Sequence, residues 1–190
     1  MEIGITLRNM GPAAEPAILA RCARAADESS LDSVWVMDHV AIPPDDAEGS
    51  GGLYLDFINE CFSREVIKAN GQPFLFRPRP PRPPIYNGGK APHALTRAVK
   101  YGDGWFPIAE VLSQLREGVK TYRELASRAG RDEPEVVTFG QVPLEDSATA
   151  LDTLAAYREA GVTHFIHGLR YDQPGPFIDA VSALEGLLAT

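Results

Sequence analysis

Short apolar runs alternate with longer amphipathic segments along most of this chain. The runs with the length and composition of β-strands lie at residues 3–7, 33–37, 85–86, 105–107, 135–140 and 163–167. Apolar residues with helical spacing occupy residues 14–29, 57–69, 92–101, 112–128, 147–160 and 174–188, with Ser147 expected as the cap of its helix. This alternation predicts an α/β fold around a parallel sheet.

Two segments refine the pattern. Residues 33–37 are nearly all apolar, so we expect that strand to be buried on both faces, as strands of parallel sheets are. Residues 72–84 are dense in proline, which excludes a helix or a central strand there.

The stretch at residues 83–107 organises the rest of the chain. It is predicted to form a strand, a turn at Gly88 and Gly89, a helix with Pro92 in its first turn, and a second strand after Gly102. Backbone N–H groups and the helix dipole then point into one place, which favours a phosphate or another anion. The alternative is a tight turn without a ligand.

The candidate ligand-binding groups follow strands and do not precede them. Asp38 and His39, the pair Gly88 and Gly89, Gln141, and residues 168–170 each come directly after a predicted strand. Ligands bind at this edge in α/β barrels and open parallel sheets. No comparable group is expected at the N-terminal ends. The asymmetry predicts that the chain binds a small molecule.

Composition narrows the class of protein. The chain has 190 residues and a net charge of −8, which suits one globular domain and argues against nucleic acid as a partner. Cys22 and Cys61 lie in helical patterns, are expected to be buried free thiols, and have no metal-site spacing. No apolar run reaches membrane length, and Met1 leads directly into a strand. We therefore expect a cytoplasmic protein without a membrane partner.

Four sequence segments carry a resemblance to a known family. They are I-G-I-T-L, S-V-W-V-M-D-H-V, R-P-P-R-P-P-I-Y-N-G-G and A-L-T-R-A-V-K-Y-G-D-G-W-F-P. They resemble the luciferase-like monooxygenases, particularly the branch that uses the deazaflavin coenzyme F-420. The resemblance implies a (β/α) barrel and an oxidoreductase dependent on FMN or F-420.

The chain is shorter than the family barrel. After Asp56 the sequence resembles a segment that follows the fourth helix in the family. The resemblance therefore implies an incomplete TIM-like barrel of about six parallel strands, with the central strands missing. We expect one domain, 1–190, made of an N-terminal part (1–56), a helix and proline-rich connection (57–84) and C-terminal βα units (85–190).

The resemblance also assigns site residues. Asn87, Gly88 and Gly89 match the family segment that contacts the phosphate-bearing tail of the cofactor. His167 is a further cofactor-binding candidate, because its position in the predicted strand is near the ligand-binding edge. Asp38 and His39 match a pair near the cofactor ring, where His39 would donate or accept a proton. The alternatives are hydrogen bonding by His39 at the strand end and by Asp38 to a loop N–H group. No metal site is implied.

Three functions follow. The first is a flavin- or deazaflavin-dependent oxidoreductase acting on a small-molecule substrate, and the second is a non-catalytic flavin-binding or interaction protein. The third is a non-functional remnant that folds only by self-association. Missing strands would leave an open sheet edge that needs a cover, so we expect a homodimer. They also predict weak cofactor binding and little turnover.

Overall fold

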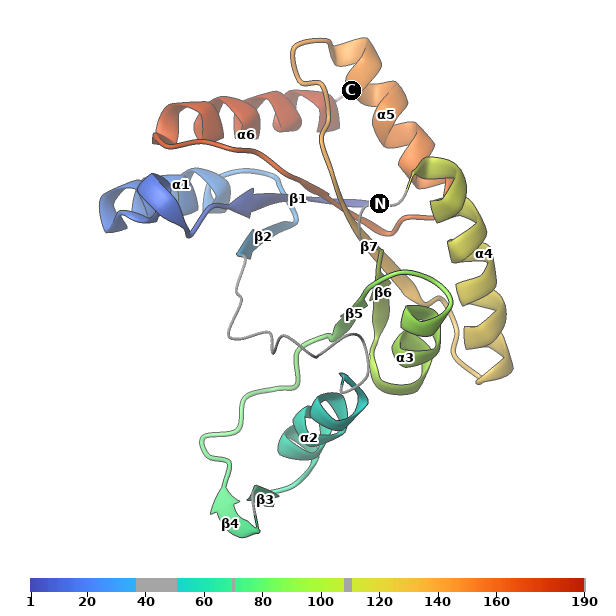
Figure 1. The fold of residues 1–190 in the computed structure, drawn as a ribbon. Coiled ribbons are helices and arrows are strands. Elements are labelled where there is room, and N and C mark those ends of the chain that lie inside the picture. Colours follow the sequence, from blue (N-terminus) through green and yellow to red (C-terminus); the bar gives the residue numbers. More distant parts are fainter. Residues whose placement is uncertain (37–50, 70, 108–110, 190) are drawn as a thin grey trace.

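The structure is a computed structural model that describes residues 1–36, 51–69, 71–107 and 111–189. Six parallel strands form one curled sheet in the order β2-β1-β8-β7-β6-β5 (Figure 1). The strands are β1 (Glu2–Leu7), β2 (Ser33–Val36), β5 (Tyr86–Gly88), β6 (Gly104–Phe106), β7 (Glu135–Gly140) and β8 (His164–His167). The predicted incomplete TIM-like barrel is confirmed.

Helices follow most of these strands and cover the outer face of the sheet (Figure 1). A short 3-10 helix, η1 (Gly11–Ala14), precedes the first of them. The α-helices are α1 (Pro16–Asp27), α2 (Gly51–Ser63), α3 (His93–Tyr101), α4 (Leu112–Arg128), α5 (Ser147–Glu159) and α6 (Pro174–Leu188). No helix within the described ranges has both the length and the hydropathy required to cross a bilayer.

The two edges of the sheet come close without pairing. Within the described residues, β2 pairs only with β1, and β5 pairs only with β6. The Trp35 ring on β2 nevertheless lies 5.9 Å from the Tyr86 ring on β5 and 6.3 Å from the Phe106 ring on β6. Aromatic packing across the concave face therefore joins edges that a complete barrel would connect through further strands.

The packing of α4 against β6 centres on one buried indole. Trp105 is fully buried, and its ring lies 6.1 Å from that of Tyr122. A Cβ at Gly118 would come within 2.5 Å of the Trp105 ring, so this helix position requires glycine. Trp105 therefore packs between α4 and the sheet.

The expected burial of the second strand is wrong. Val34 and Val36 point to the outer face of β2 and remain 43% and 58% exposed. The reason is coverage: β2 is an edge strand, and no described helix packs on its outer face. An apolar run therefore identified the strand correctly, but none of the described helices covers its outer face.

The segment after residue 50 also differs from the prediction. Helix α2 begins and ends about six residues earlier than expected, and β3 (Val66–Ala69) and β4 (Gln72–Leu75) form an antiparallel hairpin. Gly71 turns between the strands with φ at 78°. The dipeptide Asn70-Gly71 is a strong hairpin signal, and it outweighs the helical spacing of the preceding apolar residues.

The proline-rich connection is fixed to the sheet by one arginine. Arg82 donates from Nε to Asn59 Oδ1 of α2 at 3.0 Å and from a terminal nitrogen to Asp103 Oδ2 at 2.7 Å. The same carboxylate accepts the Ile85 N–H at 2.8 Å. Arg82 thus has a structural role in attaching α2 and the proline-rich connection to the start of β5.

Two smaller expectations have clear outcomes. The cap of α5 is Asp146 and not Ser147, because the Asp146 carboxylate accepts the N–H groups of Ala148 and Thr149 at 3.1 and 3.3 Å. The buried free thiols are confirmed, since Cys22 and Cys61 are 0% and 7% exposed.

Candidate ligand site at the carboxyl edge of the sheet

A cavity of about 420 Å³ opens at the carboxyl ends of β1, β7 and β8. Its walls are largely apolar, with polar side chains at intervals around them. The lining residues are Thr6, Arg8, Asn9, Met10, Phe139, Gly140, Gln141, Gly168, Leu169 and Arg170. This carboxyl-edge cavity has the size and the mixed lining typical of small-molecule sites.

Arg8 holds one wall of the carboxyl-edge cavity in place. Its guanidinium pairs with Asp172 and donates to the Tyr171 carbonyl oxygen. The backbone N–H of Arg8 donates to the Tyr171 hydroxyl at 2.8 Å. Burial raises the pKa of Tyr171 to about 12, so the hydroxyl is protonated at neutral pH. These contacts join the loop after β1 to the loop after β8, which gives Arg8 a positioning role.

The turn at Gly88 and Gly89 lies at the same edge, directly after β5. Gly89 adopts φ at 121°, a conformation that favours glycine. Its N–H donates to the Phe106 carbonyl at 3.2 Å, and its carbonyl accepts the Trp105 indole N–H at 2.9 Å. The Gly89 amide is therefore already paired, and an anion here would use other N–H groups of the turn or displace this bond.

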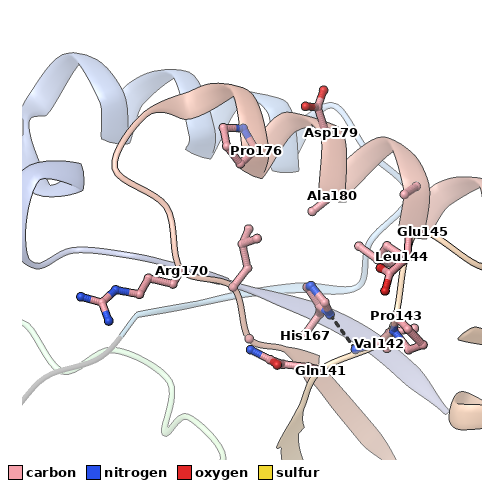
Figure 2. A pocket seen from close by; sticks show the side chains of 13 residues that line it. Gln141, Val142, Pro143, Leu144, Glu145, His167, Arg170, Pro176, Asp179 and Ala180 are labelled. Carbon is pink, nitrogen blue, oxygen red and sulfur yellow. Dashed lines mark hydrogen bonds between the residues drawn. The ribbon is translucent and has the colours of Figure 1, made fainter.

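Two further predicted residues point away from the carboxyl-edge cavity. The Asn87 side chain is buried against Gly102, where a Cβ would meet its Nδ2 at 2.0 Å. That Nδ2 has no hydrogen-bond partner among the described atoms. His167 lies on the outer face of β8 and borders a separate cavity beneath α6 (Figure 2).

Paired polar side chains lie at the N-terminal ends of the strands, where the sequence analysis expected none. His164 Nε2 lies 2.6 Å from a Glu2 carboxylate oxygen, and the Tyr86 hydroxyl donates to Glu135 at 2.5 Å. Arg131 donates to the Ala98, Val99 and Asp103 carbonyls at 2.9, 2.9 and 3.1 Å, which satisfies the end of α3. Polar groups at this edge pair with one another, and strand order alone could not reveal that.

Comparison with known proteins gives the family. A sequence model of the luciferase-like monooxygenase family matches residues 54–183. This chain belongs to the luciferase-like monooxygenases. The fold is also similar to that of an F420-dependent secondary alcohol dehydrogenase in complex with an F420-acetone adduct, with a TM-score of 0.65 and 14% identity over 97% of each chain. No curated protein matched the sequence.

Sequence reasoning on this luciferase-like chain missed one basic residue. Arg97 on α3 donates to the Gly88 carbonyl at 3.4 Å, and its guanidinium lies 3.2 Å from where a Gly89 Cβ would be. A positive charge therefore lies beside the glycine turn. The available signal was an arginine on the first turns of the helix that follows a glycine pair. His93 on the same helix is exposed.

The predicted catalytic pair cannot be compared with the cavities described above. Asp38 and His39 fall outside the described residues, so their assignment stays a prediction. They follow β2 in sequence.

Proposed function

We propose that this chain is a flavin- or deazaflavin-dependent oxidoreductase that binds FMN or F-420 at the carboxyl edge of its half-barrel. The observation that supports this most is the carboxyl-edge cavity, which lies at the same edge of the sheet as the glycine turn. The bound cofactor would supply hydride or electron transfer. The chain would supply binding, orientation and proton transfer.

The lining is chemically suited to such a cofactor. Phe139, Leu169 and Met10 offer apolar surface to a flat ring, while Gln141 and Arg170 offer hydrogen bonds to polar ring edges. Arg97 and the glycine turn provide a positive charge and backbone donors for a phosphate.

Binding is tested by titrating the protein with FMN and with F-420 while recording absorption and fluorescence. Arg97→Gln is expected to weaken cofactor affinity about tenfold, which corresponds to about 1.4 kcal/mol. Arg128→Gln, an exposed change on another helix, is the matched control. Equal affinity in both variants would contradict the phosphate assignment.

A substitution at Gly89 is a less clean test of the same turn. Gly89→Val would place a branched side chain at φ 121°, and its Cβ would lie 3.2 Å from Arg97 and 3.3 Å from Ala94. Lower cofactor affinity in that variant would therefore combine blocked access with backbone strain. The Arg97 variant separates the two effects.

Catalysis is proposed to depend on His39 as the general acid–base, with Asp38 beside it in sequence. An unperturbed histidine titrates near pH 6.5, which suits proton transfer at neutral pH. A secondary alcohol with F-420 is the first assay to run, because the structural neighbour is an alcohol dehydrogenase. His39→Ala should lower turnover and leave cofactor affinity nearly unchanged. Loss of binding would instead assign His39 a positional role.

The incomplete barrel supports a second candidate function, a flavin-binding protein without turnover. The sheet has unpaired edges at β2 and β5 within the described residues, where a complete barrel would have strands behind the ring. Misplacement by about one ångström can cost roughly a hundredfold in rate. A cofactor that binds but is not reduced by any alcohol would favour this function.

We also propose that the chain forms a homodimer through β2. Val34 and Val36 are exposed on the outer face of an unpaired strand, and such an edge promotes association unless it is covered. Light scattering at micromolar concentration should give a dimer mass, and Val36→Lys should shift it toward the monomer. Leu151→Lys, at a 40% exposed site on α5, is the control. A monodisperse wild-type monomer would refute the proposal.

A further inference from the structure

A second cavity, of about 890 Å³, lies on the outer side of the sheet (Figure 2). The loop between β7 and α5, the end of β8 and one side of α6 enclose it. This cavity, called here the α6 cavity, is larger than the carboxyl-edge cavity and is reached from the opposite face of β8. The two cavities share a common wall made of Gln141, Gly168, Leu169 and Arg170.

His167 forms the buried floor of the α6 cavity. The residue is 4% exposed, and its Nδ1 accepts the Val142 N–H at 3.2 Å. This bond fixes the tautomer, so Nε2 carries the proton. Burial lowers the pKa of His167 below 6.5, which keeps the ring neutral near pH 7. The ring therefore offers a single N–H donor at Nε2.

The Nε2 donor faces the α6 cavity. In Figure 2 the His167 ring stands between the sheet and α6, toward Pro176 and Ala180. Among the described residues, none supplies an acceptor to Nε2. A donor at a cavity wall that is not used within the protein keeps its hydrogen-bonding capacity for water or for a bound molecule. An acceptor oxygen of a bound molecule would satisfy this one.

The charges around the α6 cavity restrict the class of that molecule. Glu145 and Asp179 contribute two carboxylates to its lining, and Arg170 contributes one guanidinium. A phosphate would meet net negative charge and a neutral imidazole, which is unfavourable. An ammonium group beside Glu145 would be attracted. A ligand that has both an acceptor oxygen and an ammonium group matches this lining.

We propose that the α6 cavity binds a small zwitterion of the amino-acid type. Its carboxylate would accept the His167 Nε2–H, and its ammonium group would lie toward Glu145, with Asp179 at the outer rim (Figure 2). The site is separate from the carboxyl-edge cavity. The proposal does not depend on FMN or F-420 binding.

Three matched probes test the charge pattern by calorimetric titration of the full chain. γ-Aminobutyrate carries both groups, butyrate only the carboxylate and butylamine only the ammonium group. The zwitterion is expected to bind at least tenfold more tightly than either of the others. Glu145→Gln should remove most of that preference, whereas Glu124→Gln, an exposed change on α4, should leave it intact.

The role of His167 is read from its ring nitrogens by NMR of the wild-type protein. Saturation with γ-aminobutyrate should shift the His167 Nε2–H signal and leave the exposed His93 unchanged. His167→Phe should abolish binding, and if that variant does not fold, the wild-type signal decides. The proposal is overturned by butyrate binding as tightly as γ-aminobutyrate, by no binding of any probe at tens of millimolar, or by an unshifted His167 signal.

Discussion

The two edges of the same curled sheet differ in how their polar groups are used. At the N-terminal edge, Glu2 pairs with His164, Tyr86 pairs with Glu135, and Arg131 satisfies backbone carbonyls. At the carboxyl edge, two cavities open, and the His167 Nε2 donor has no partner among the described residues.

This difference separates residues that stabilise the fold from residues available to a ligand. A polar group that is already paired contributes to stability and has little left to offer a small molecule. An unpaired donor at a cavity wall contributes little to stability and keeps its full hydrogen-bonding capacity for a ligand. Substitutions at the N-terminal edge should therefore change stability, and substitutions at the carboxyl edge should change ligand binding.

The largest expected effect is at the N-terminal edge, at Arg131. Arg131→Ala removes three charge-assisted hydrogen bonds and leaves carbonyls at the end of α3 without partners. We expect a loss of about 3 kcal/mol in the free energy of unfolding, measured by urea denaturation. Arg128→Ala, exposed on α4, should cost little. Equal losses in the two variants would remove the distinction between paired and solvent-facing arginines.

A smaller effect is expected at Tyr86 on the same edge. Tyr86→Phe removes the hydroxyl bond to Glu135 and should cost about 1 kcal/mol. Burial, together with the bond and charge of Glu135, raises the pKa of Tyr86 above its usual value of 10.0. The hydroxyl therefore stabilises the fold up to about pH 10 and loses that contribution as the pH rises toward the higher folded-state pKa.

The pH dependence provides the check on that assignment. The free energy of unfolding of wild type and of Tyr86→Phe is measured at neutral pH and above pH 10. The difference in this free energy between the two proteins should be smaller above pH 10. A constant difference would mean that the phenol contributes through packing and not through its proton. Cofactor titrations of the folded variant should match wild type, because Tyr86 is at the opposite edge from the cavities.

The sequence predicted the βα units well, because there the local pattern and the tertiary partner agree. Helices α4 and α6 and strand β7 have the predicted bounds, since glycine or proline marks an end of each helix. Around β2 and α2 the local pattern was insufficient. Burial of Val36 depends on a covering helix that the described structure lacks. The helical spacing of residues 57–69 predicted a helix up to residue 69, whereas in the structure β3 and β4 form a hairpin around the Asn70-Gly71 signal.

For the candidate site, sequence predicted the edge but not the direction of the side chains. Residues after β5, β7 and β8 do gather at the carboxyl edge. Asn87 and His167, however, point to the outer face, because their strand positions alternate with inward ones. The contact of Arg97 with the glycine turn and the pairing of Glu2 with His164 join residues on separate elements, which a linear pattern does not report.

Asp146 tests the comparison from within the carboxyl edge, because it is a paired polar group there. Its carboxylate accepts from the Thr149 hydroxyl and from the N–H groups of Thr149 and Ala148, and these bonds lower its pKa below 3.8. Asp146→Ala should lower the urea midpoint, and Ser147→Ala should not. The contribution of Asp146 is present above about pH 4 and is lost as the pH falls through the lowered value. A larger effect at Ser147 would restore the original cap assignment.

The smallest expected effect on stability is at His167, whose main role is proposed to be in binding. Burial lowers its pKa below 6.5, so the unfolded chain binds a proton more readily than the folded one does. The resulting stability is complete above about pH 6.5 and falls as the pH decreases toward the lowered folded-state value. The charged side chains that line the same cavity are those of Glu145, Arg170 and Asp179.

A matched substitution isolates that contribution. His167→Asn does not titrate and retains an oxygen that can accept the Val142 N–H. Between pH 7.5 and pH 5, urea midpoints of wild type should therefore decrease more than those of His167→Asn, with His93→Asn as the exposed control. The His164 and Glu2 pair is present in all three proteins, so its contribution to stability cancels in the comparison. Parallel pH profiles for wild type and His167→Asn would show that His167 is not held neutral by the fold, and the single-donor geometry of the α6 cavity would then be wrong.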